Sequence, residues 1–188
     1  MRWERLFADL EAQAEAAAAG ELAGEVASRT RHEVGTLRLV DRLRPAIGAP
    51  VRITCDGAEE VAGALRAVGA DWLLVSESSG REAVVALGHV CAVSGTGALS
   101  AVPGSEGKVT ARLGLRNSLR GIARDRAPVR VLTSGGPMAG TIDRVGADFI
   151  EIALHAQGEA RRARSVLGVR AVPIAAIILV RSGAAAGG

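Results

Sequence analysis

Aromatic residues and lysine are scarce in this chain of 188 residues, which has two Phe, two Trp, no Tyr and a single lysine, Lys108. With so few rings, a site that stacks nucleobases or flat ligands on aromatic side chains is hard to build. The positive charge is carried almost entirely by arginine. Arginine suits the recognition of phosphate or carboxylate groups, but a genome rich in G and C produces the same excess. The net charge of +3 does not by itself indicate a nucleic-acid-binding protein.

Long apolar runs and clustered cysteines are also missing. No segment approaches the roughly 18 apolar residues of a membrane span, and the opening MRWERLFADLE carries acidic residues where a signal peptide needs an apolar stretch. Cys55 and Cys91 are too few and too far apart to form a zinc site, and both fall in apolar, strand-like runs. We therefore expect buried thiols in a cytoplasmic protein that has no membrane partner.

The chain contains an internal repeat. Residues 49–72 read APVRITCDGAEEVAGALRAVGADW, and residues 127–149 read APVRVLTSGGPMAGTIDRVGADF. The match resumes between residues 84–93 and 171–180, and the leucines of the two lead-in segments, 37–44 and 113–120, also correspond. A duplication explains these matches far better than chance does.

Four regions are predicted around the two repeats. Residues 1–36 read as a long amphipathic helix, because Trp3, Leu6, Phe7 and Leu10 recur at helical spacing. The repeats follow as residues 37–95 and 109–182, each a short helix followed by short alternating strands with glycines at the bends. Residues 96–108, rich in Gly, Ser and Ala, are predicted to link them, and residues 183–188 to form a flexible tail.

The pattern of glycines and apolar residues resembles the Sm-like family. The residues that carry the resemblance are Val51, Ile53, Gly57, Gly63, Leu65 and Gly69 in the first copy, and Val129, Val131, Gly135, Gly140, Ile142 and Gly146 in the second. It implies a mainly β fold with helices, built from two tandem Sm-like or SH3-like small β-barrels, each preceded by a helix. It also implies RNA binding, although Leu73 and Ile150 stand where the uridine-binding members of the family have Asn.

Arginines provide the main candidate binding surface. Arg112, Arg116, Arg120 and Arg124 recur every four residues, so on a helix they form a stripe that can follow phosphates. The alternative is a solvated face that pairs with acidic residues. A longer loop in the second repeat adds Arg161, Arg162 and Arg164.

Catalytic motifs are not recognisable. His32, His89 and His155 fall in unrelated segments, and no spacing indicates a metal site or a cofactor. We therefore predict a non-catalytic binding protein, nucleic-acid-associated through RNA or DNA, or a regulatory factor. The alternative is a protein-interaction or assembly module whose partners dock on strand edges and on Leu6, Phe7 and Leu10. Open strand edges also predict pairing of the two copies within the chain or self-association.

Overall fold

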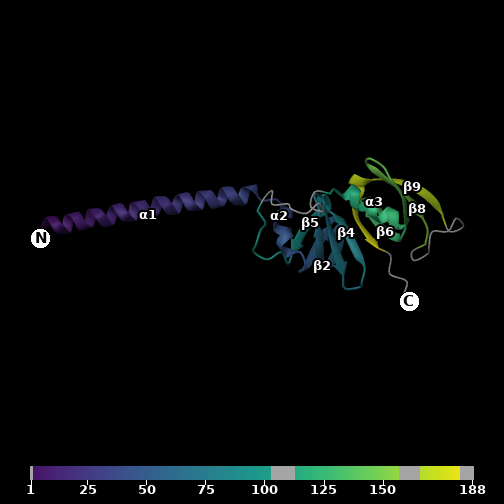
Figure 1. Cartoon of the computed structure of the whole chain (residues 1–188), viewed down its shortest axis with the longest axis horizontal. Coiled ribbons are helices and arrows are strands. Elements are labelled where there is room, and N and C mark those ends of the chain that lie inside the picture. Colours follow the sequence, from purple (N-terminus) through teal and green to yellow (C-terminus); the bar gives the residue numbers. More distant parts are fainter. Residues whose placement is uncertain (1, 103–112, 157–165, 183–188) are drawn as a thin grey trace. The chain divides into compact units, whose positions relative to one another are not determined.

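The computed structural model describes residues 2–102, 113–156 and 166–182. The chain divides into two compact units, Met1–Arg38 and Leu39–Gly188. The first unit is helical and the second is mainly β (Figure 1).

The first unit consists of the helix α1 (Arg2–Thr36). Over the whole length of this helix the apolar residues of the sequence do not fall on one face, so the prediction of an amphipathic helix is wrong. The alanine- and glycine-rich stretch at residues 16–20 is the reason, because it supplies no large side chain to continue a face. Among the described side chains of α1, Phe7, Leu22 and Val34 are all exposed. No helix within the described residues is both long enough and apolar enough to cross a membrane.

The second unit is built on one antiparallel sheet. Its strands are β1 (Pro50–Cys55), β2 (Glu60–Val68), β3 (Trp72–Glu77), β4 (Glu82–Ala86), β5 (Val90–Ser94), β6 (Pro128–Thr133), β7 (Gly136–Val145), β8 (Phe149–Leu154), β9 (Gly168–Pro173) and β10 (Ile177–Ser182). Within the described residues they are hydrogen-bonded in the order β5-β1-β2-β3-β4-β10-β6-β7-β8-β9. The first five strands belong to the first repeat and the other five to the second.

The prediction of two tandem small barrels is wrong, because the ten strands form a single open sheet. In each repeat the last strand returns to the first, as β5 pairs with β1 and β10 with β6. In the first repeat the next-to-last strand, β4, does not pair with β5 to close a barrel. Its second edge pairs instead with β10 of the other repeat. Alternation along the sequence predicts strands, but it contains no information on which distant strand takes each edge.

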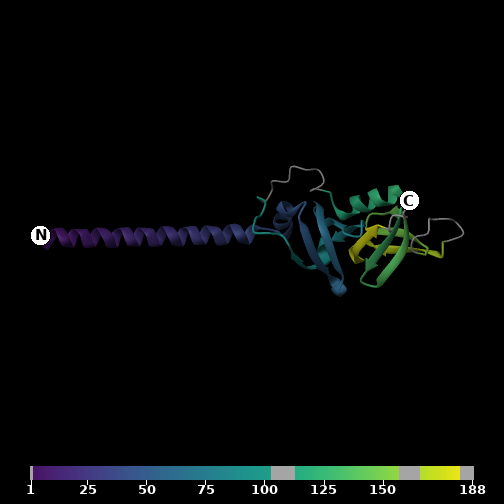
Figure 2. The ribbon, with the colours of Figure 1, turned by 90° about the horizontal axis from the view of Figure 1, so that it is seen from below.

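Helices and short turns precede and connect these strands. The helix α2 (Leu39–Leu43) and the turn η1 (Arg44–Ala46) come before the first repeat, and α3 (Leu115–Asp125) comes before the second. The helix α3 lies beside the strands of its own repeat, as two views show (Figures 1 and 2), and it contacts β7. Further one-turn helices in the described part of the chain are η2 (Asp56–Ala58), η3 (Leu87–His89) and η5 (Ile174–Ala176).

The duplication is visible in structural detail. The turns η3 and η5 occupy equivalent places before the last strand of each repeat. Gly63 in β2 and Gly140 in β7 also correspond, and a Cβ atom would lie 2.1 Å from a backbone carbonyl oxygen of β3 at the first and 2.2 Å from one of β8 at the second. Only glycine allows so close an approach of neighbouring strands.

Each repeat has its own cluster of buried side chains, and each cluster includes residues from the other repeat. The first cluster contains Leu43, Ile53, Leu65 and Leu73, and the second contains Leu119 with the isoleucines of β7 and β8. Side chains of β10 also enter the first cluster, and side chains of β3 and β4 enter the second. The two repeats therefore form one packed unit.

Candidate functional site

The joint, by which we mean the pairing of β4 with β10, is where the two repeats meet. Its register pairs Val85 with Leu179, Val84 with Val180 and Ala83 with Arg181. Beyond these pairs, the backbone N–H of Glu82 donates to Ser182 Oγ at 2.9 Å. The joint is thus a continuous antiparallel ladder between segments about a hundred residues apart, as the separation of Glu82 from Ser182 shows.

Side chains cross the joint in both directions. Ile178 and Leu179 of β10 are 3% and 1% exposed and belong to the core cluster of the first repeat. Val84 and Ala86 of β4 are 8% and 6% exposed and belong to the cluster of the second repeat, together with Trp72 of β3. Each repeat therefore completes the core of the other. The joint is stabilised by the hydrophobic effect in addition to its backbone hydrogen bonds.

A nearly buried arginine adds polar contacts to the joint. Arg181 donates from Nε to Glu77 Oε1 at 3.1 Å, from Nη2 to the carbonyl oxygen of Glu60 at 2.9 Å, and from Nη1 to Glu59 Oε1. Burial by itself lowers the pKa of Arg181, but the hydrogen bond to Glu59 and the charges of Glu77 and Glu59 outweigh it, so the pKa is raised overall. These hydrogen bonds hold β10 against the first repeat, and their partners Glu77 and Glu59 lie 104 and 122 positions from Arg181 in the sequence.

The turn before β3 holds the start of α3. Asp71 Oδ1 accepts a hydrogen bond from the backbone N–H of Leu115, the first residue of α3, at 2.6 Å. Trp72 Nε1 donates to the carbonyl oxygen of Leu113 at 2.7 Å. A carboxylate at a helix N-terminus satisfies a free N–H group and complements the helix dipole. Both repeats contain an Asp-aromatic pair at this turn. In the first repeat the pair, Asp71 and Trp72, contacts the segment that begins the second repeat.

The free edges, by which we mean the outer sides of β5 and β9, end the sheet. Neither strand has a further strand beside it among the described residues. Cys91 and Ala92 in β5 are exposed, as are Ala171 and Pro173 in β9. A free edge presents backbone N–H and C=O groups that can pair with another strand. Among the residues that the structure describes, the sheet therefore ends at both sides in a strand with one unpaired edge.

In β9 the outward-facing backbone groups include those of Ala171. The backbone groups of successive residues in an antiparallel ladder point to opposite sides. Just after β9, the N–H of Ile174 donates to the carbonyl oxygen of Asp148, which lies next to β8. Counting back by alternation, Val172 points its groups toward β8, and Ala171 points them outward. Pro173 also points outward, where its missing N–H costs no ladder bond.

In β5 the backbone groups of Val93 point outward from the sheet. The N–H of Cys55 donates to Glu59 on the β2 side of β1, so by alternation the groups of Ile53 also face β2. Ile53 lies opposite Val93 in the register of β1 and β5, and these two do not exchange hydrogen bonds. The N–H and C=O of Val93 therefore point away from β1, to the outside of the sheet.

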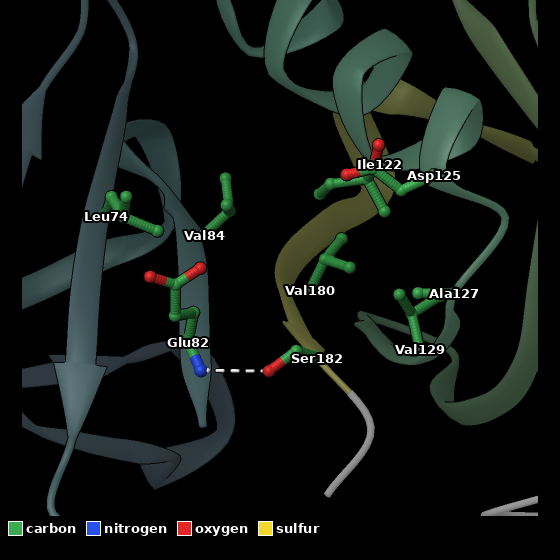
Figure 3. A pocket seen from close by; sticks show the side chains of 9 residues that line it. All are labelled: Leu74, Glu82, Val84, Ile122, Asp125, Ala127, Val129, Val180 and Ser182. Atoms are coloured by element: carbon green, nitrogen blue, oxygen red, sulfur yellow. Dashed lines mark hydrogen bonds between the residues drawn. The ribbon is translucent and has the colours of Figure 1, made fainter. Parts of the chain in front are cut away.

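One small pocket lies beside the joint (Figure 3). It has a volume of about 130 Å³. Its walls come from both repeats, and its carboxylates are Glu82 and Asp125, while most other lining residues are apolar. Pockets that enclose a drug-sized ligand measure roughly 300–1,000 Å³. This one is too small for such a ligand.

The arginines predicted as a binding stripe are placed differently from one another. The helix α3 begins at Leu115, so the stripe on it consists of Arg116, Arg120 and Arg124. Arg116 donates from Nε to the carbonyl oxygen of Gly146 at 2.8 Å and is half-buried, whereas Arg120 and Arg124 are exposed. The other predicted arginines, Arg112, Arg161, Arg162 and Arg164, lie outside the described residues.

The residues predicted to bind a partner lie on α1. Phe7 is 60% exposed. The side chains of Leu6 and Leu10 lie outside what the structure describes. The partner-binding role of these three residues stays a prediction.

The carboxylate of Asp56 contacts both a histidine and a cysteine. His89 Nδ1 lies 2.8 Å from Asp56 Oδ2, and the thiol of Cys91 donates to Asp56 Oδ1 at 3.2 Å. This hydrogen bond raises the pKa of Cys91, which opposes formation of the thiolate that a nucleophilic cysteine needs. Cys55 is buried as predicted, but Cys91 is exposed, because it lies on a free edge. Edge position, which alternation does not reveal, could not be predicted from the sequence.

A second histidine lies in a buried polar contact of the second repeat. His155 is buried, with Nε2 2.9 Å from Thr141 Oγ1 and Nδ1 3.0 Å from the carbonyl oxygen of Ala156. The part of the chain that the structure describes contains no group of three or more His, Cys, Asp or Glu side chains that could hold a metal ion. No model of a known protein family matches the chain, and no curated protein matches it. The resemblance to the Sm-like family thus stays a prediction.

Proposed function

We propose that this protein is a non-catalytic assembly module that binds other polypeptides by adding a strand to a free edge of its sheet. The observation that carries this proposal is the joint, where the chain already holds two separate repeats together by strand pairing. The free edges present the same kind of backbone surface at both ends of the sheet. Strand addition is a common mode of peptide recognition, in which main-chain hydrogen bonds give affinity and side-chain pockets give specificity.

One feature supports a non-catalytic role. Asp56 hydrogen-bonds to both His89 and Cys91, and it stabilises the neutral thiol of Cys91, so this group is not arranged to activate a nucleophile.

A peptide with the sequence of residues 176–182, which includes β10, tests the proposal. In the joint this strand pairs with β4, and the corresponding free strand of the second repeat is β9. We expect the fluorescence anisotropy of the labelled peptide to rise in a saturable manner when the protein is added. The substitution Ala171→Pro removes an outward N–H from β9 and should abolish the rise, while Val93→Pro, on the other edge, should leave it unchanged. A peptide that binds neither edge contradicts the proposal.

Nucleic-acid binding is the second candidate, and it is favoured by the exposed arginines around the end of α3. Arg120, Arg124, Arg126 and Arg130 are all exposed in this region. Contacts of arginine with phosphates weaken steeply as salt is added. We expect binding of labelled single-stranded RNA or duplex DNA to fall with salt and to be lost in the Arg120→Ala/Arg124→Ala variant if this candidate is correct.

A matched control distinguishes binding at a local site on α3 from a general effect of the positive charge of the protein. Arg66 and Arg144 are exposed arginines on β2 and β7. The Arg66→Ala/Arg144→Ala variant loses the same charge without changing α3. Equal binding by both variants would contradict a nucleic-acid surface on α3, and absence of binding at low salt would remove this candidate.

A further inference from the structure

We propose that the partner of each free edge is a second copy of this chain, with β9 of one molecule pairing antiparallel to β5 of the next. The inference builds on the proposed function and names the polypeptide that is added. It follows from the duplication, because the joint already shows how the next-to-last strand of one repeat pairs with the last strand of the other. Applied to the ends of the sheet, the same contact joins two molecules head to tail.

The registers within the repeats establish which residues correspond. In the first repeat Ile53 pairs with Val93, and in the second Val131 pairs with Val180, so Val93 is the counterpart of Val180. The same comparison of the pairs between β3 and β4 and between β8 and β9 makes Ala171 the counterpart of Val84. In the joint Val180 lies opposite Val84. The contact between molecules therefore places Val93 opposite Ala171.

The backbone directions fit this register. Val93 and Ala171 are the residues whose N–H and C=O groups point outward from β5 and β9. An antiparallel pair in which both residues point toward each other exchanges two hydrogen bonds. Pro173, which has no N–H, is the counterpart of Ala86, and Ala86 lies outside the paired register of the joint. The proline therefore does not interrupt the proposed ladder.

The side chains that cross the joint also have exposed counterparts at the free edges. Cys91 and Ala92 correspond to Ile178 and Leu179, which enter the core of the other repeat. Ala171 and Pro173 correspond to Val84 and Ala86. At the free edges all four of these side chains are exposed, whereas in the joint all four counterparts are buried. The free edges thus carry small apolar side chains at the positions that the joint covers.

An aromatic residue beside the free edge gives a second, independent contact. Phe149 is the counterpart of Trp72, and it is 37% exposed where Trp72 is 6% exposed. Trp72 packs against the second repeat and bonds to the segment before α3. The corresponding segment before the first repeat includes Leu39, which is 42% exposed where its counterpart Leu115 is 4% exposed. Two large apolar side chains are therefore left uncovered at the two ends that we expect to meet.

The contact between molecules should be weaker than the joint. The side chains that would cross between molecules are smaller than those that cross the joint. Ser94 also stands where the joint has Arg181 with its three hydrogen bonds. We therefore expect an association that reverses on dilution. Because the two surfaces differ, each molecule can bind one neighbour at each end.

Sedimentation velocity over a dilution series tests this inference on the full chain. We expect the wild-type protein to exceed twice the monomer mass at high concentration and to dissociate as it is diluted. Ala171→Pro and Val93→Pro should each be monomeric, because each blocks one of the two surfaces while removing no hydrogen bond within the sheet. Mixed together, the two variants should form a one-to-one dimer and nothing larger, since one retains β5 and the other β9.

Further variants cover the event that a proline disturbs folding, which circular dichroism would show. Ala171→Lys leaves the backbone intact and places a charge on the free edge, a device that keeps natural sheet edges apart. Phe149→Ser removes the uncovered aromatic ring. Both should weaken association at least tenfold, and Arg66→Ala, on an exposed position of β2, should not change it.

The outcomes separate this inference from the proposed function. A wild-type protein that stays monomeric at every concentration overturns self-association, while the strand peptide of residues 176–182 still decides whether β9 accepts a strand. Association that persists in Val93→Pro alone overturns the head-to-tail arrangement, because it requires contact through two β9 strands. If the protein associates but Ala171→Pro and Ala171→Lys both associate like the wild type, the contact does not use β9 and the inference is wrong.

Discussion

Replacing Arg181 by methionine should destabilise the protein more than any other single change of a charged residue at the joint. Methionine keeps most of the length of the side chain but removes three hydrogen bonds, two of them to carboxylates. The side chain of Arg181 is 12% exposed and that of Glu77 is 11% exposed, so the change leaves a nearly buried carboxylate without its main partner. The nearest remaining cation is Arg81, whose Nε lies 3.6 Å from the other oxygen of Glu77.

The expected loss follows from this geometry. Breaking a buried ion pair by removing one partner costs about 3–5 kcal/mol. Glu59, with 32% of its side chain exposed, can regain water, which places the loss at the lower end. We expect a decrease of about 3 kcal/mol in the free energy of unfolding, and a decrease of roughly 6–12 °C in Tm for a unit of this size.

Urea unfolding followed by circular dichroism measures the loss, and two variants make it specific. Arg130→Met removes an exposed arginine that lies opposite Arg181 in the ladder and should change stability by at most about 0.5 kcal/mol. Arg181→Met/Glu77→Met removes both charges and should be more stable than Arg181→Met alone, because no buried charge is left unpaired. A loss below about 1 kcal/mol in the single variant, or no recovery in the double variant, would refute the reasoning.

Three further outcomes are expected. Gly140→Ala should lower Tm strongly in a melting experiment, since its Cβ would lie 2.2 Å from a carbonyl oxygen of β8, whereas Gly121→Ala, with nothing within 4 Å, should not lower it. The hydrogen bond to a carboxylate raises the pKa of His89 above 6.5, so the stability that His89 adds over His89→Gln is fully present below that pH. That advantage should shrink in urea unfolding as the pH rises through the raised pKa, and an advantage that grows would contradict it. Iodoacetamide should modify exposed Cys91 in the folded protein but spare Cys55, whose burial raises its pKa to about 11, and mass spectrometry of peptides distinguishes the two sites.

The sequence could predict what is local and repeated. The glycines at Gly63 and Gly140 mark the same close approach of strands in both repeats, because a missing Cβ is a property of one residue and its neighbours. Asp71 could be predicted to bond to backbone N–H groups from its position in a turn. Its partner, the N–H of Leu115, lies 44 residues away and could not.

What the sequence could not predict is pairing between distant segments. Nothing in the alternation of β4 or β10 shows that these two strands meet, and so five strands in each repeat were predicted to close as a barrel. The partners of Arg181 are equally hidden, because they lie more than a hundred positions earlier. The hydrogen bond from Arg116 to the carbonyl oxygen of Gly146 is hidden for the same reason, because it joins segments 30 residues apart.

The divergence of the two copies supports a permanent joint and a reversible free edge. Where β10 crosses into the other repeat it has Ile178 and Leu179, and the corresponding positions of β5 have Cys91 and Ala92. Large apolar side chains on a free edge favour uncontrolled aggregation, so small ones there limit unwanted pairing while leaving the backbone groups available. If this reasoning is correct, Cys91→Ile/Ala92→Leu should convert the free edge into a copy of the joint. Sedimentation should then show association that resists dilution, and unchanged association would mean that the identity of these two residues does not control the edge.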